Sequence, residues 1–199
     1  MWWIFLACGA APAPVHDLDA VALRDAIVRD DLVGARAAAR RVADVFPWNG
    51  RGGPVDDAAG AIAAAPDLAT AAANLGRLLV ACAGCHHTSA GAPPAAPQGA
   101  EGVSAEMTRH QYGAEGLWRG ILRRDEAEIR DAVSLLSAGS AFLSGSDVDP
   151  SLPPVGRQWE ADVHRLAARV RDEPKARAEA YGELLLTCAV CHATVRDPR

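Results

Sequence analysis

Two short runs of cysteine and histidine are the residues of this chain whose types and spacing could do chemistry. Both read C-x-x-C-H, and no other cysteine besides Cys8 occurs in the 199 residues. This pattern is the attachment signature of haem c. Its two thiols add to the two vinyl groups of one porphyrin, and the imidazole that follows becomes the proximal ligand of the iron. The predicted attachment residues and proximal ligands are Cys82, Cys85 and His86 in the first motif, and Cys188, Cys191 and His192 in the second.

The same four cysteines could in principle form another kind of site. Zinc ribbons separate their two C-x-x-C pairs by about 15–20 residues, whereas Cys85 and Cys188 are 103 positions apart. A thioredoxin-like redox pair would require a βαβ setting, and the surrounding sequence is not β-like. The sequence therefore predicts two covalent haem c cofactors.

Internal repetition gives both motifs the same setting. Displacing the chain by 94 positions aligns residues 16–39 with 110–133, and eight of these 24 pairs are identical. A displacement of 106 positions aligns residues 67–88 with 173–194, including both motifs and the pair Gly76 and Gly182. The chain is therefore interpreted as a tandem duplication, in which the second copy has an additional loop within residues 137–156.

The proline and glycine content predicts where the boundary between the two modules lies. Residues 89–103 are rich in both and read as a linker. The predicted division is a signal or lipobox segment at residues 1–8, a first haem c module at 9–96 and a second at 97–199. Each module is predicted to contain four helices, with Asp31 capping one helix and Pro174 in the first turn of the last. The predicted helices span residues 17–29, 32–46, 56–65, 67–85, 105–124, 126–137, 157–170 and 175–191. Since no segment shows sustained β alternation, the predicted fold is all-α.

The amino-acid composition and charge limit the classes of partner expected for this protein. Half of the residues are hydrophobic and only 5% are aromatic, which suits helices packed closely through alanine. The formal net charge of −5 argues against nucleic acid as a partner. It favours redox partner proteins that present a basic surface. No run approaches the roughly 20 apolar residues needed to span a bilayer.

The apolar N-terminus, which ends at Cys8 and Gly9, resembles the end of a bacterial lipoprotein signal. This resemblance implies removal of the signal and lipidation of Cys8, and so a membrane tether. The alternative is an ordinary N-terminus with a free thiol. In either case covalent haem attachment implies export, so the expected location is periplasmic or associated with the outer membrane.

A haem motif at the end of a fourth helix resembles the cytochrome c′ and cytochrome c556 family of four-helix bundles. Ordinary class I cytochromes c instead carry the motif near the N-terminus of a domain, with a ligand methionine afterwards, and neither half has such a methionine. The family resemblance implies a haem between helices and a distal position formed by the first helix. That position is vacant in cytochrome c′ and filled by methionine in c556.

The first predicted helix of each module offers a histidine at this distal position. His16 and His110 begin equivalent apolar faces, with apolar residues four, seven and eleven positions later. In an up-down-up-down bundle the start of the first helix lies beside the end of the fourth. We therefore predict His16 and His110 as the distal ligands. Met107 is an alternative in the second module only, because Ala13 stands in its place in the first, and His87 and His164 are expected to contact solvent or haem propionates.

With both axial positions filled, iron has no open site for a substrate, so the predicted function is electron transfer and not enzyme catalysis. The alternative is a gas-binding, sensing or peroxide-handling haem protein with an open distal position, which the cytochrome c′ resemblance permits. A third interpretation is a relay subunit of a larger redox complex.

Overall fold

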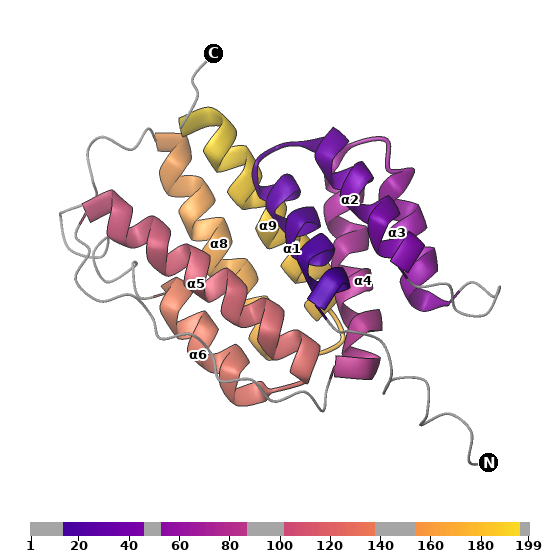
Figure 1. The fold of residues 1–199 in the computed structure, drawn as a ribbon. Coiled ribbons are helices and arrows are strands. Elements are labelled where there is room, and N and C mark those ends of the chain that lie inside the picture. Colours follow the sequence, from indigo (N-terminus) through magenta and orange to yellow (C-terminus); the bar gives the residue numbers. More distant parts are fainter. Residues whose placement is uncertain (1–13, 46–52, 87–101, 138–153, 196–199) are drawn as a thin grey trace.

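The computed structural model describes residues 14–45, 53–86, 102–137 and 154–195, and every regular element within them is an α-helix (Figure 1). The prediction of an all-α fold is confirmed for this part of the chain. The helices are α1 (Pro14–Val28), α2 (Leu32–Val45), α3 (Pro54–Ala63), α4 (Leu68–His86), α5 (Gly102–Arg123), α6 (Glu126–Ser137), α8 (Pro154–Asp172) and α9 (Arg177–Val195).

The turn after the first helix of each half has the same construction. Asp30 and Arg124, which the 94-residue repeat aligns, both adopt a left-handed backbone with φ of 59° and 56°. The following residues, Asp31 and Asp125, donate their backbone N–H groups to carbonyls five residues earlier, at 2.9 Å in both cases. This is the helix-ending hydrogen bond of a Schellman turn.

Those same aspartates then begin the next helix. The Asp31 carboxylate accepts the N–H of Gly34 at 2.7 Å, and the Asp125 carboxylate accepts the N–H of Glu128 at 3.1 Å. The prediction that Asp31 caps a helix is confirmed. Side-chain oxygens satisfy N–H groups that the first turn of a helix leaves unpaired, so the repeated sequence produces a repeated turn.

The last helix begins later than its sequence predicts. Pro174 was expected in its first turn, but it lies in a separate turn, and α9 starts at Arg177. The backbone N–H of Ala176 bonds to the carbonyl of Glu173 at 2.9 Å, which closes that turn. The Arg177 side chain also donates to the carbonyl of Val170 at 2.8 Å. These contacts fix a short connection between α8 and α9, and the prediction for Pro174 is wrong.

The two motif-bearing helices, α4 and α9, pack directly against each other. Gly76 faces the backbone of Ala178, and Gly182 faces the backbone of Ala72, so closely that a Cβ atom on either glycine would collide with a carbonyl oxygen. Residue numbers rise along one helix as they fall along the other, so the pair is antiparallel. Figure 1 shows this direction, with α4 ending at the lower edge of the molecule and α9 at the upper edge.

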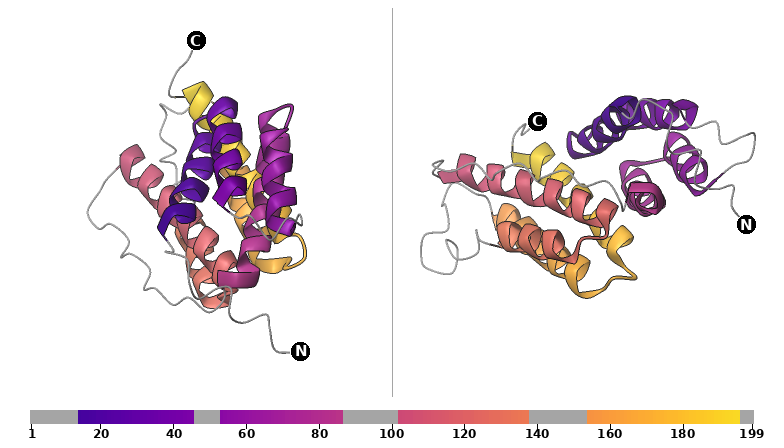
Figure 2. Two further views of the ribbon diagram at one scale, coloured as in Figure 1. Left: turned by 45° about the vertical axis from the view of Figure 1, so that its right-hand side comes forward. Right: turned by 60° about the horizontal axis from the view of Figure 1, so that its bottom comes forward.

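The remaining helices pack around this pair. The first four helices lie on one side and most of the last four on the other (Figure 2). α1 contacts α2, α4 and α9, and α5 contacts α6, α4 and α9. The buried side chains of both halves form one continuous hydrophobic cluster. The sequence predicted that the first helix of each half would pack on the fourth helix of the same half, but α1 packs more extensively on α9 than on α4, and α5 packs more extensively on α4 than on α9.

Replacing Gly76 with alanine tests the importance of the antiparallel contact. The added Cβ atom has no room beside Ala178, so the backbones must separate, and we expect a loss of about 1–3 kcal/mol in unfolding free energy. Gly60, in α3, has no atom within 4 Å of an added Cβ. Gly60→Ala is therefore the matched control and should stabilise by about 0.5–1 kcal/mol through helix propensity. Urea unfolding measures both, and equal effects would contradict the packing.

Candidate functional site

The two C-x-x-C-H motifs form the last turns of α4 and α9. On a helix, residues three and four positions apart lie on one face, so each first cysteine shares a face with its second cysteine and histidine. Cys82 and Cys188 are half-buried and pack against the hydrophobic core. Both helices therefore direct the first thiol of their motif inward, although the side chain of Cys85 lies outside the described residues.

The antiparallel pair separates the two motifs. Its crossing is centred near Asn74 and Ala180, between the two glycine contacts. His86 and His192 each follow that centre by 12 residues along their helix. At about 1.5 Å per residue, each histidine lies about 18 Å beyond the crossing, in opposite directions, so about 36 Å separates them along the helices. The motifs thus occupy opposite ends of the molecule.

The Cys188 thiol packs against the hydrophobic core although the residue as a whole is half-buried. Burial raises its pKa to about 12, and the neighbouring thiol of Cys191 contributes in the same direction. Two turns earlier on the same face of α9 lies Tyr181, which is fully buried and donates its hydroxyl to the carbonyl of Ala114 in α5 at 3.2 Å. Burial also raises the pKa of Tyr181. This face of α9 therefore contacts α5 at Tyr181.

The second cysteine of the same motif lies beside α8. Burial raises the pKa of Cys191, and the Glu160 carboxylate raises it further through charge repulsion. Glu160 is only 9% exposed. The second motif is therefore bordered by α8, which packs along α9.

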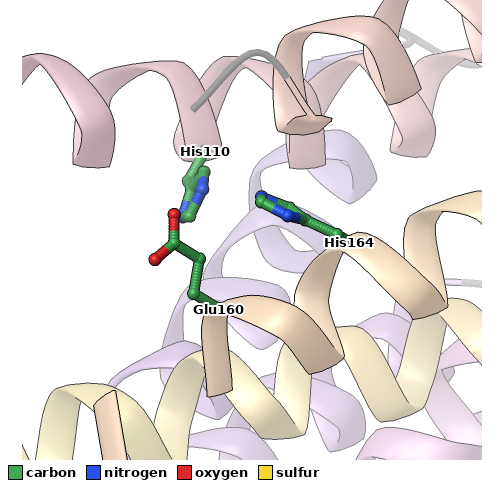
Figure 3. A group of neighbouring side chains, drawn as sticks. All are labelled: His110, Glu160 and His164. Atoms are coloured by element: carbon green, nitrogen blue, oxygen red, sulfur yellow. The ribbon is translucent and has the colours of Figure 1, made fainter. Parts of the chain in front are cut away.

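Three side chains meet between α5 and α8, and we call them the His–Glu cluster: His110, Glu160 and His164 (Figure 3). One potential ligand atom from each lies within 4.8 Å of the others. The rings of His110 and His164 are 6.2 Å apart between centroids and perpendicular, at 89°. Because Glu160 also acts on Cys191, the cluster lies next to the second motif.

His110 reaches this place through the register of α5. It lies one turn before Ala114, the residue whose carbonyl accepts the Tyr181 hydroxyl. That contact joins α5 to Tyr181, which lies near the start of α9 and 11 residues before His192, so the association of His110 with the end of the last helix stays a prediction. Met107, the alternative ligand, is 37% exposed, whereas His110 is half-buried within the cluster.

In the first half, fewer of the predicted site residues have side chains within the described part of the chain. His16 belongs to the first turn of α1, and α1 contacts α4, but its side chain lies outside the described residues, as do Cys8 and His87. His86 is half-buried at the end of α4. The structure therefore brings the helix carrying His16 to the helix carrying the first motif and leaves the predicted ligation of the first iron a prediction.

Sequence analysis assigned no role to Glu160 and only a peripheral one to His164. The available signal was their spacing of four on a helix, which places both on one face. It could not show that this face turns toward His110, since α5 and α8 are separated by α6 and a long connection.

Comparisons with known proteins add no relative: no protein-family model, no curated protein and no solved structure matches the chain. Within the described residues, none of the helices combines the length and apolar character required to cross a membrane.

Because the Cys188 thiol is buried, we expect it to be alkylated slowly in the folded chain before haem attachment. Raising a thiol pKa from 9.0 to about 12 lowers the thiolate fraction at pH 8 about a thousandfold, and the thiolate is the reactive form. Iodoacetamide should therefore alkylate Cys188 far more slowly than Cys191 in the haem-free folded protein. Fragment mass spectra separate the two sites, and urea-unfolded chain is the control. Equal rates in the folded protein would show that Cys188 is not enclosed.

Proposed function

We propose that this chain is a dihaem c-type cytochrome of two tandem four-helix modules, which transfers single electrons between redox proteins on the periplasmic side of a bacterial membrane. The single observation that carries the proposal is the repeated C-x-x-C-H motif in the last turns of the equivalent helices α4 and α9. The inward first thiols, Cys82 and Cys188, support it.

The residues around the second motif fit a covalent haem. Cys188 and Cys191 present two thiols from one helical face, His192 follows them, and the imidazole of His110 is held on the neighbouring helix. The thiols would form the thioether bonds, and His192 and His110 would be the iron ligands that the chain supplies. When bound, the haem supplies an iron that changes its oxidation state by one electron.

Filling both axial positions from the chain favours electron transfer over substrate binding. His86 with His16, and His192 with His110, would each leave no open coordination position for a gas or peroxide. Bis-histidine ligation also holds the potential below that of methionine–histidine ligation. The two sites would then act as carriers and not as catalytic centres.

Separation of the motifs favours two independent carriers. Unit charges about 36 Å apart interact by about 0.1 kcal/mol in water and about 0.5 kcal/mol at an effective dielectric constant of 20. Reduction at one end would therefore change the potential at the other very little. Each end of the molecule can exchange electrons with a partner of its own.

Covalent haem attachment requires export, and lipidation of Cys8 would tether the exported chain to a membrane. Cys8 lies outside the described residues, so this part of the proposal depends on the sequence.

Two haems per chain are expected, because the two motifs have separate thiols. Protein produced with haem-maturation machinery should give two haems in a pyridine haemochrome assay. Replacing Cys82 and Cys85 with alanine should remove one haem and leave the other, since Cys188 and Cys191 are at the opposite end of the helix pair. A single haem in the wild-type chain, or loss of both in the variant, would be inconsistent with the proposal.

Axial ligation is tested by removing each distal histidine. His16→Ala should convert about half of the low-spin absorbance to high-spin and create one carbon monoxide site, because Ala13 offers no replacement donor. His110→Ala should do the same for the second haem. Visible and electron paramagnetic resonance (EPR) spectra of both variants and of the double variant measure this. An unchanged low-spin spectrum in the double variant would assign the distal ligands elsewhere, and a high-spin wild type would favour the gas-binding alternative.

A further inference from the structure

The His–Glu cluster makes the two ends of the molecule chemically unequal. Glu160 and His164 belong to α8, which has 19 residues, whereas α3 in the first half has 10. Throughout the described ranges, no second group of three such side chains comes together. Whatever the cluster does, it does at the second haem site.

The geometry of the His–Glu cluster allows the Glu160 carboxylate to orient the imidazole of His110. In Figure 3 a carboxylate oxygen of Glu160 points to the ring of His110, and the His164 ring approaches the same imidazole from the side. The nearest potential ligand atoms lie within 4.8 Å of one another. Glu160 is also nearly buried, and a carboxylate removed from water requires such polar partners.

We propose that Glu160 is a positioning residue for His110, and that it makes the second haem harder to reduce. This inference rests on the proposed function, in which one ring nitrogen of His110 is an iron ligand. The other ring nitrogen would donate its N–H to the Glu160 carboxylate, which fixes the tautomer and makes the imidazole a stronger donor. The negative charge near the site acts in the same direction, because it favours the oxidised iron. His164, packed at 89° to His110, limits rotation of the ring.

The same three residues have the composition of a zinc site, with two imidazoles and one carboxylate. α8 and α9 pack against each other across the short connection at residues 173–176; Glu160 lies 12 residues before the end of α8, and Ala189 lies 12 residues after the start of α9. The cluster therefore lies level with the thiols that would carry the porphyrin, which favours the haem site over a separate ion site. A second metal ion there would compete with haem for His110. The cluster is therefore assigned to the haem site.

Glu160→Gln in the haem-loaded full chain tests the inference. The substitution keeps the size of the side chain and removes its charge. We expect the reduction equilibrium of the second haem to shift about tenfold toward the reduced form, a rise of about 59 mV for one electron. Spectroelectrochemical titration measures the reduction potential of each haem. The redox transition that changes in the His110→Ala variant identifies the second haem. The first haem is an internal reference and should not move.

Two further variants distinguish the positioning of His110 by Glu160 from a general effect of charge on the reduction potential. Asp162 lies two residues away on α8 and pairs with Arg165 at 3.2 Å on the exposed side. Asp162→Asn therefore removes the same charge without touching the cluster, and it should leave both potentials unchanged. Glu160→Asp keeps the charge and should recover part of the wild-type potential and EPR signal of the second haem. Circular dichroism and thermal unfolding of each variant report on the fold.

The possible results distinguish a failure of the inference on Glu160 from a failure of the proposed function. If His110→Ala opens the second haem but Glu160→Gln leaves its potential within the shift seen for Asp162→Asn, the inference on Glu160 is wrong and the proposed function stands. If His110→Ala leaves the second haem low-spin, both the ligand assignment and the inference are overturned. If Glu160→Gln disturbs the fold, Glu160→Asp decides instead: a second-haem potential and EPR signal identical to those of the wild type would overturn the inference.

Discussion

The antiparallel packing of α4 against α9 determines where everything else in this molecule lies. Backbone meets backbone at Gly76 with Ala178 and at Gly182 with Ala72, so the two helices approach more closely than larger side chains would allow. Dispersion contacts strengthen steeply at short range, and a long, closely packed pair can act as the central element of a small core. The helices of both halves pack around this pair in one hydrophobic cluster, even though the sequence suggests two separate units.

This central pair carries the chemistry at its outer ends. Each motif lies about 18 Å from the crossing along its helix. The first thiols face the core, while the histidines occupy the last turns. An arrangement of this kind separates stability from chemistry: small residues at the centre hold the helices together, and ligand residues at the ends remain available to cofactors and partners.

Duplication produced similar backbones but not identical sites. The turn at Asp30 and Asp31 recurs at Arg124 and Asp125 with the same φ and the same caps. The third helix differs, since α8 is nearly twice as long as α3 and carries Glu160 and His164, which meet His110. Under the proposed function, this difference would give the two haems different potentials.

The sequence by itself determined the helices, their approximate ends, the repeat and the two motifs, because each depends on local spacing: a capping aspartate, a period near 3.6 or a C-x-x-C-H run. It also indicated His110, since a histidine repeated at the start of equivalent apolar faces is a local pattern. The tertiary structure alone decided that α4 and α9 cross, that the motifs lie at opposite ends, and that Glu160 and His164 face His110. Those results depend on which helix faces meet across 49 or more intervening residues, and burial against a partner is a property that no local pattern contains.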